Sequence, residues 1–265
     1  MAPAATAPVP ASDGSLPRAR LMVLADKVRR VLATEAVIES VRRAPLPGLY
    51  EVVVDKSILY VDEAVNYVFQ GSIHDVRAGD NHTAARLSEV RRVPPQEWPL
   101  DAALKVVKGD GSRTVLLFED PHCGYCKQMR RVSLQEITDV TIYTVPVAIL
   151  GPESADIVHR VWCSPDPMKA WDDWMLRDVM PALAKEQCET PEARLDAFRT
   201  KWRIESTPTI VVADGRRVAN ALAPAGLDRV ISEGQLRSKA GAKPVAAPVP
   251  LAAPSAASAA SAPGL

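Results

Sequence analysis

Two cysteines stand three positions apart in the stretch FEDPHCGYCKQM, residues 118–129, where an apolar run gives way to a helical pattern. A pair with this spacing serves as a redox-active dithiol, as half of a zinc site or as a structural disulfide. A cysteine at the start of a helix meets unpaired backbone N–H groups and the positive end of the helix dipole, which favour the thiolate. We therefore expect Cys123 to be the nucleophile and Cys126 the resolving thiol beneath it.

The other two cysteines, Cys163 and Cys188, bear on the zinc alternative. They form no second CxxC, and residues 127–162 separate Cys163 from Cys126, which is unlike a compact zinc ribbon. An inert bond is disfavoured as well, because a CxxC disulfide at a helix tip is typically reactive and readily reduced. We favour redox chemistry and expect no metal and no cofactor, but spacing alone eliminates neither alternative.

A threonine and a proline, Thr207 and Pro208, stand immediately before the apolar run TIVVA. A proline at the start of a strand is awkward, and a cis peptide bond would place it in a tight turn. We predict a cis bond here; the alternative is an ordinary trans proline that opens an edge strand.

The histidines allow fewer conclusions. His122 precedes the nucleophile and is either a cation that favours the Cys123 thiolate or an exposed bystander. The other three, His74, His82 and His159, show no ligand spacing and are interpreted as structural.

Composition excludes several classes of partner. Lysine plus arginine and aspartate plus glutamate each number 32, so no overall charge attracts nucleic acid or an anionic membrane. No apolar run approaches the ~20 residues that span a bilayer, so we expect a soluble chain without stable membrane insertion. Residues 1–15 lack the basic start and apolar centre of a secretory signal, which fits a cytosolic protein or an exported one whose signal was replaced by Met1.

The front half of the chain has the pattern of a small α+β unit. Apolar residues recur at helical intervals, then short runs rich in Val, Ile, Tyr and Phe follow, and a helical pattern returns before Pro94-Pro95. The expected elements are a helix over 18–34, strands over 37–42, 49–54, 57–62 and 65–70, and a linker helix over 82–93.

The back half has the order of a parallel βαβ unit with additions. Helical patterns fill 153–202, and Asp214-Gly215 predicts a hairpin. The expected elements are strands over 105–109, 114–120 and 140–147, a helix over 126–136 between the last two, and a final helix over 226–237.

Both ends are rich in Ala, Pro and Ser without aromatic residues, which predicts disorder. The predicted domains are a disordered segment 1–16, a front domain 17–80, a linker helix and hinge 81–99, a catalytic domain 100–238 and a disordered tail 239–265.

Together these motifs resemble the DsbC/DsbG family of periplasmic thiol:disulfide isomerases. The resemblance rests on CGYC at 123–126 after an FxD strand end, on TPT at 207–209, on RVWCSPDPMKAWDDWM at 160–175 followed by Cys188, and on QGSIHDVR at 70–77. It covers about 220 residues, and the combination is specific where no single piece would be.

The resemblance implies a cystatin-like dimerisation domain, a linker helix and a thioredoxin-like catalytic domain with a helical insertion. Two chains would form a V whose cleft binds unfolded protein, and in such folds the cis-proline turn packs beside the CxxC. Gly124 and Tyr125 resemble the isomerase branch. Cys163 and Cys188 match the family's structural disulfide, which would contribute about 3–4 kcal/mol and implies an oxidising compartment, the periplasm.

By the same resemblance the expected function is a disulfide isomerase, also acting as a chaperone, that reshuffles misfolded disulfide-containing proteins. A membrane reductase of the DsbD type would keep Cys123 reduced. The alternatives are a DsbG-like reductase that protects sulfenylated cysteines, a non-catalytic client-binding chaperone and, more remotely, a zinc module.

Overall fold

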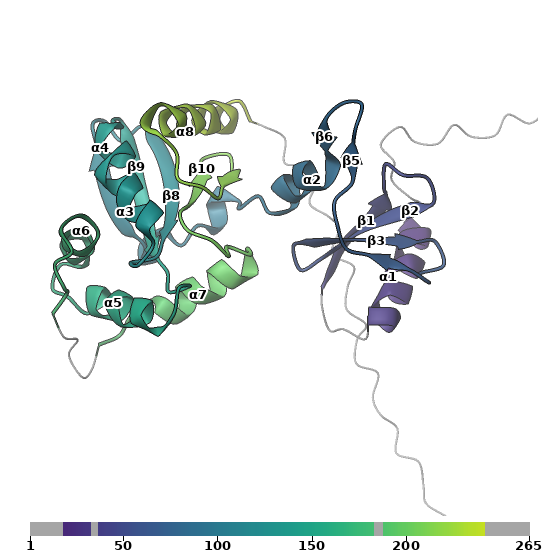
Figure 1. Ribbon diagram of the computed structural model, residues 1–265, viewed down its shortest axis with the longest axis horizontal. Helices are drawn as coiled ribbons and strands as arrows, with labels where there is room; N and C mark the ends of the chain where they lie inside the picture. Colours follow the sequence, from purple (N-terminus) through teal and green to yellow (C-terminus); the bar gives the residue numbers. More distant parts are fainter. Residues whose placement is uncertain (1–17, 33–36, 183–187, 242–265) are drawn as a thin grey trace, which may run out of the picture. The chain divides into compact units, whose positions relative to one another are not determined.

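The computed structural model describes residues 18–32, 37–182 and 188–241. The chain divides into two compact units, and the boundary in sequence falls between Leu87 and Ser88. Figure 1 shows the helices and strands of each unit. The predicted disordered segment 1–16 and nearly all of the predicted tail lie outside the described residues.

The first unit contains helix α1 and a four-stranded antiparallel sheet with strand order β1-β2-β3-β4, followed by a short hairpin and the start of α2. The predicted helix and the first three predicted strands are confirmed, but the strand predicted over 65–70 is wrong in its extent. Val65 has a left-handed φ of 58°, which breaks the extended backbone. The elements are α1 (Arg18–Leu32), β1 (Ile38–Arg43), β2 (Leu49–Val54), β3 (Ser57–Asp62) and β4 (Val68–Phe69).

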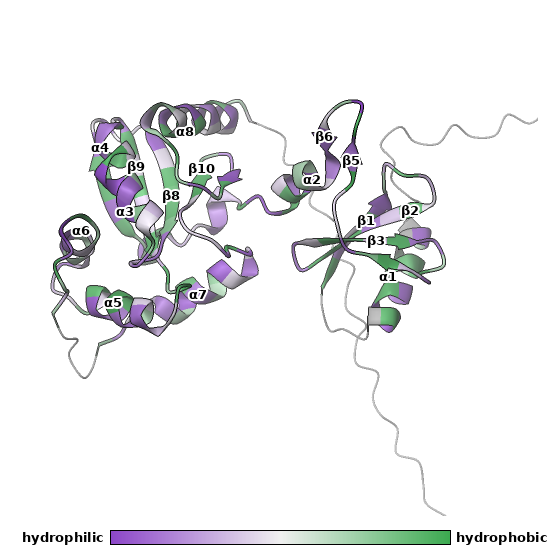
Figure 2. Ribbon diagram, in the orientation of Figure 1, coloured by the Kyte–Doolittle hydropathy of each residue, from purple (hydrophilic) through white to green (hydrophobic). Residues whose placement is uncertain are grey.

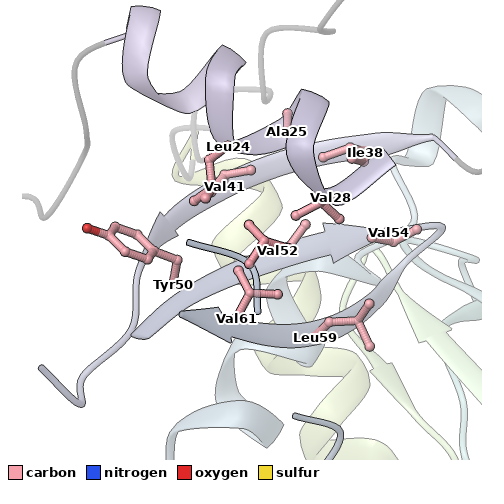
Figure 3. Close-up of a cluster of buried hydrophobic side chains, with 11 residues drawn as sticks. Leu24, Ala25, Val28, Ile38, Val41, Tyr50, Val52, Val54, Leu59 and Val61 are labelled. Atoms are coloured by element: carbon pink, nitrogen blue, oxygen red, sulfur yellow. The ribbon is translucent and has the colours of Figure 1, made fainter. Parts of the chain in front are cut away.

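The core of this unit lies between α1 and one face of the sheet (Figure 3). Residues one helical turn apart, Leu24 and Val28, point to the sheet, and Val52 and Val61 face them from the central strands. All four are at most 5% exposed, so the helix is held by burial of its apolar stripe.

Two side-chain contacts attach helix α2 (His82–Val90) to this sheet. Thr83 Oγ1 lies 2.6 Å from Tyr60 Oη, and Arg86 Nε donates to Glu51 Oε1 at 2.9 Å. The helix follows a short hairpin, β5 (His74–Asp75) and β6 (Asp80–Asn81), and ends three residues before the predicted Val93.

The second unit is built on a five-stranded sheet of order β11-β10-β8-β9-β7. Strands β8 and β9 are parallel, as the βαβ pattern predicts, and the other neighbours are antiparallel. The predicted hairpin is confirmed at Gly215, whose φ is 82°. The strands are β7 (Leu104–Lys108), β8 (Arg113–Glu119), β9 (Val140–Pro146), β10 (Thr209–Val212) and β11 (Arg217–Val218).

Alternate residues of β8 enter two separate cores. Val115 and Leu117 pack with α3 (Gly124–Arg131), α4 (Ser133–Glu136) and α8 (Pro224–Lys239). Leu116 and Phe118 instead pack with α7 (Glu192–Lys201), with Trp98 and with Ala102 of η2 (Leu100–Ala102). Figure 2 shows the apolar colour running along β8 and β9. The helices are η1 (Pro95–Glu97), η2 (Leu100–Ala102), α3 (Gly124–Arg131), α4 (Ser133–Glu136), α5 (Pro152–Trp162), α6 (Pro167–Arg177), α7 (Glu192–Lys201) and α8 (Pro224–Lys239).

The single helix predicted over 126–136 is wrong, because the chain forms two helices separated at Val132. Val132, with φ −117° and ψ −75°, is the C-cap of α3 and the N-cap of α4 and belongs to neither helix, and Gln135 Nε2 donates to the carbonyl of Arg130 at 3.0 Å. A β-branched residue here and a side chain that competes for the helix carbonyl explain the break. The final helix reaches Lys239, the first residue of the predicted tail.

Candidate functional site

The two central cysteines lie where β8 gives way to α3. Cys123 is the N-cap residue, and the backbone N–H of Cys126 donates to its Sγ at 3.4 Å. Sulfur thus occupies the place that a serine or aspartate oxygen takes at other helix starts. The first sulfur is held against the exposed amides of the helix, as the strand–helix pattern predicts.

The proline turn meets this sulfur from far along the chain. The peptide bond between Thr207 and Pro208 is cis, as predicted, and Cys123 Sγ donates to the Thr207 carbonyl at 3.4 Å across 84 positions. β10 begins at the next residue, Thr209, and pairs with β8. Because β8 ends at the cysteine loop, this pairing brings the two motifs together.

The two sulfurs differ in access. Cys123 is 6% exposed and Cys126 is fully buried, and both are free thiols. Burial raises the pKa of the Cys126 thiol, and the charge of Glu119 raises it further. The protonated form of Cys126 is therefore favoured, and an incoming disulfide can meet only Cys123.

A buried ion pair lies behind the cysteines, and the sequence patterns did not indicate it. Glu119, the last residue of β8, is fully buried and accepts from Arg130 Nε at 2.6 Å and from Trp171 Nε1 at 3.3 Å. Burial raises the pKa of Glu119, and Arg130 opposes that change. Arg130 also contacts Asp172 at 2.7 Å and Thr144 at 2.8 Å. The helix that carries Cys126 is thus tied to the sheet by charge.

A second buried carboxylate shapes the loop itself. Asp120 accepts the backbone N–H of His122 at 2.9 Å, the N–H groups of Ile149 and Leu150 at 2.9 and 3.0 Å, and the hydroxyl of Ser154 at 2.7 Å. One side chain therefore fixes the residue before the nucleophile and the loop that follows β9. The aspartate of the FxD motif gave a signal for this role, but its partners could not be read from spacing.

The remaining predicted neighbours, His122, Gly124 and Tyr125, flank Cys123 in the sequence, before and within the first turn of α3. His122 is exposed, with its ring edge-to-face on Trp174 at 5.6 Å, and Tyr125 is 69% exposed. Gly124 has open space where a side chain would begin. Lys127 Nζ lies 4.4 Å above the Trp174 ring and pairs with Asp178.

The other two cysteines form a disulfide, as the resemblance implies. Cys163 and Cys188 have Cα atoms 5.7 Å apart, and the bond joins positions 25 apart in sequence. Among the described residues no hydrogen bond or disulfide joins them to the first pair, and no three His, Cys, Asp or Glu side chains of those residues gather around a possible metal position. Among those residues, too, no helix is both long and apolar enough to cross a bilayer.

Family models match both halves of the chain. Residues 100–234 match a thioredoxin-like domain, and residues 5–84 match the N-terminal domain of disulfide bond isomerase proteins. Both matches agree with the fold class expected from the sequence.

Two relatives carry the same name. A probable thiol:disulfide interchange protein DsbC of Bordetella pertussis is 41% identical over 185 residues, which are 70% of this chain and 65% of that protein. DsbC of Escherichia coli K12 is 26% identical over 215 residues, 78% of this chain and 87% of the relative. The match thus spans less than two thirds of the Bordetella protein.

Among solved structures, a disulfide interchange protein from Neisseria gonorrhoeae is 33% identical, with a TM-score of 0.49. That match covers 52% of this chain and 99% of the other.

Proposed function

The chain belongs to the DsbC/DsbG family of thiol:disulfide interchange proteins, and from this membership we propose that it is a disulfide isomerase working through Cys123 and Cys126. The observation that carries the proposal is the position of Cys123 Sγ, between the start of α3 and the Thr207 carbonyl beside a cis proline. A sulfur at a helix N-terminus suits a thiolate, and the neighbouring backbone can align an extended client.

In the proposed reaction the Cys123 thiolate attacks one sulfur of a non-native disulfide. A new bond joins Cys123 to the client, the old S–S bond breaks, and the other client sulfur leaves as a thiolate. That thiolate can attack elsewhere in the client and return Cys123 unchanged, which completes isomerisation. Alternatively, Cys126 attacks Cys123, which releases the client reduced and leaves the pair oxidised.

The state of Cys126 favours the first route. Its thiol is fully buried and burial raises its pKa, so the attacking thiolate is scarce. A client bound to Cys123 therefore has time to rearrange before it is released. An enzyme whose second thiol reacted at once would act chiefly as a reductase.

Several further properties follow from family membership and are part of the proposal. The clients are misfolded disulfide-containing proteins of the periplasm, and the protein also binds them as a chaperone. The first unit joins two chains into a homodimer. A DsbD-type membrane reductase returns Cys123 and Cys126 to the dithiol, and the Cys163–Cys188 bond stabilises the helical insertion.

The test is recovery of activity from a scrambled multi-disulfide protein, run beside a mass measurement in solution. We expect the full chain to restore activity as a dimer and Cys123→Ser to abolish the restoration. Cys126→Ser is the matched variant, because it keeps the nucleophile and should accumulate a client linked to Cys123. Full activity of Cys123→Ser would contradict the mechanism.

A parallel arm with a sulfenylated single-cysteine protein tests the DsbG-like alternative. Faster turnover of that substrate than of the scrambled one would assign the protein to reduction instead of isomerisation.

A further inference from the structure

One oxygen of the buried carboxylate behind the cysteines has no partner. Glu119 Oε2 accepts from Arg130 Nε at 2.6 Å and from Trp171 Nε1 at 3.3 Å, whereas Glu119 Oε1 is buried and has no hydrogen-bond partner among the described residues. A buried acceptor left unpaired costs free energy, so a chain that keeps one calls for an explanation. Because no N–H group screens Oε1, the charge of the carboxylate acts on its other neighbours.

The second thiol of the first pair is a titratable neighbour that this charge reaches. A hydrogen bond from the backbone N–H of Asp120, the residue after Glu119, favours the Cys126 thiolate, and Arg130 follows Cys126 by one turn on the same face of α3. Cys126 and Trp171 belong to one apolar cluster and are both fully buried. The glutamate and the thiol therefore share one interior.

The groups around the Cys126 sulfur act in opposite directions. Burial raises the pKa of the thiol most, the charge of Glu119 raises it further and Cys123 adds to the rise, whereas the N–H of Asp120 lowers it. Cys123 belongs to the reaction itself. Glu119 is the group in this set that adds a charge without exchanging a bond.

The partners of Glu119 favour its charged form. The Arg130 guanidinium cannot lose its proton, and it opposes the rise that burial causes in the pKa of Glu119. Arg130 is held in turn by Asp172 at 2.7 Å and Thr144 at 2.8 Å. Asp172 is 33% exposed and Glu119 is fully buried, so the negative charge enclosed with Cys126 is that of Glu119.

We propose that Glu119 is a positioning residue whose buried charge slows the attack of Cys126 on Cys123, and that it thereby favours isomerisation over release of a reduced client. The inference rests on the proposed function, because it concerns the second step of that reaction. Glu119 acts only through Cys126, so it changes how long the client stays bound and not which sulfur is attacked first.

The step moves one bond. In the mixed disulfide, Cys123 Sγ is joined to a client sulfur. Cys126 gives its proton to solvent, its thiolate bonds to Cys123 Sγ, and the bond to the client breaks. The electron pair leaves with the client sulfur, which takes a proton from solvent, so the cysteine pair ends oxidised and the client reduced. A negative charge beside Cys126 opposes the loss of the proton, because two like charges then share one buried cluster.

The first experiment measures the lifetime of a mixed disulfide on Cys123. The reduced full chain is mixed with oxidised glutathione, which stands in for a client disulfide, quenched with acid at successive times and peptide-mapped. With Glu119→Gln, which keeps the shape without the charge, the Cys123–glutathione adduct should disappear roughly threefold faster. One unit of thiol acidity gives about tenfold more thiolate, and the lower nucleophilicity of a less basic sulfur offsets part of that gain.

Two further variants separate charge from packing. Glu119→Asp removes a methylene but keeps the charge, so the adduct should keep its long lifetime. Asp173→Asn removes a carboxylate of α6 that pairs with Lys169 and Arg177, and it should leave the lifetime unchanged. Equal lifetimes for the unmodified chain and Glu119→Gln would overturn the proposal, as would equal shortening by Glu119→Asp or Asp173→Asn.

A double variant covers the case in which Glu119→Gln does not fold. Glu119→Gln with Arg130→Met removes both charges of the buried pair, and proteins often tolerate replacement of a whole buried pair by uncharged side chains of similar volume. The adduct should again disappear faster than in the unmodified chain. An unchanged lifetime in the double variant would overturn the proposal as well.

The last experiment relates the lifetime to the reaction. With a scrambled multi-disulfide protein, Glu119→Gln should release more reduced client and restore less activity than the unmodified chain. If the unmodified chain forms no adduct on Cys123, the proposed function fails. If the adduct forms and its lifetime is the same with and without the charge of Glu119, only the role of Glu119 fails.

Discussion

The two cysteine pairs of the second unit sit at opposite ends of helices. Cys123 caps the N-terminus of α3, where backbone amides favour a thiolate, and Cys163 caps the C-terminus of α5, where carbonyls disfavour one. Cys123 and Cys126 are buried free thiols, whereas Cys163 and Cys188 form a partly exposed disulfide. The same residue type thus meets opposite fields in one unit.

Their supports differ as well. Behind the first pair lies a buried network centred on Glu119 and Arg130, whereas the second has a surface histidine and glutamate beside a covalent bond. The comparison indicates that the reactivity of a cysteine sulfur depends on which end of a helix it caps and on the nearest ionisable group. The CxxC spacing alone does not determine that reactivity.

The largest expected effect tests the buried ion pair between Glu119 and Arg130, which lies behind the first cysteine pair. Arg130→Ala leaves Glu119 buried without its main partner, and we expect the free energy of unfolding to fall by about 3–5 kcal/mol. Urea denaturation of the reduced protein measures it.

The neighbouring residue supplies the control. Arg131 is 46% exposed and pairs with exposed Asp178, so Arg131→Ala should change the free energy of unfolding by about 1 kcal/mol or less. Equal losses for the two variants would contradict the buried network.

The next effect tests how much the Cys163–Cys188 disulfide contributes to stability. Replacing Cys163 and Cys188 together by alanine removes a cross-link between positions 25 apart and should lower the free energy of unfolding by about 3–4 kcal/mol. Exchange at Cys123 should persist in this variant, measured as the rate of mixed-disulfide formation with a model client. If the variant lost both its stability and its exchange activity at Cys123, the two cysteine pairs would not be independent.

A smaller effect compares access to the sulfurs. When all four cysteines are reduced, Cys126 should be alkylated by iodoacetamide roughly tenfold or more slowly than Cys188, because burial raises the Cys126 pKa and blocks the reagent. Peptide mapping over time measures the rates, and the urea-unfolded protein is the control in which the difference should vanish. If Cys126 were alkylated as fast as Cys188, the two sites would not differ in access.

The smallest effect is a pH dependence of opposite sign at two carboxylates. Burial raises the pKa of Glu119 above its ordinary 4.5, so the folded chain keeps this proton to higher pH than the unfolded chain. Stability is therefore lost as pH rises from the unfolded pKa through the folded one, by at most about 1.4 kcal/mol per pH unit. Glu119→Gln should flatten this fall in urea denaturation between pH 4 and 8.

Asp178 supplies the contrast. Lys127 and Arg131 lower its pKa, so its contribution is present above the unfolded pKa and is lost as pH falls through the folded one. Asp178→Asn should flatten only the acidic limb. The same change of slope in both variants would show that burial of Glu119 has no separate effect.

Much of the scaffold follows from local patterns. The order of elements, the parallel βαβ unit and the hairpin at Gly215 are confirmed, because strand and helix periods and turn residues are visible within a few positions. The break at Val132 and the shortness of β4 were missed, since single backbone angles, including the positive φ of Val65, ended elements whose apolar pattern continued.

The candidate site, too, has features that follow from local sequence and others that depend on tertiary contacts. The sequence alone determined that a CxxC lies at a strand–helix junction, because strand, cysteines and helix are consecutive. Only the tertiary structure brought Thr207 to Cys123, buried Glu119 against Arg130, and placed His159, which the sequence marked as structural, between Cys163 and Glu192. These contacts join residues on different elements, and packing of the elements, which no local period records, decides which side chains meet.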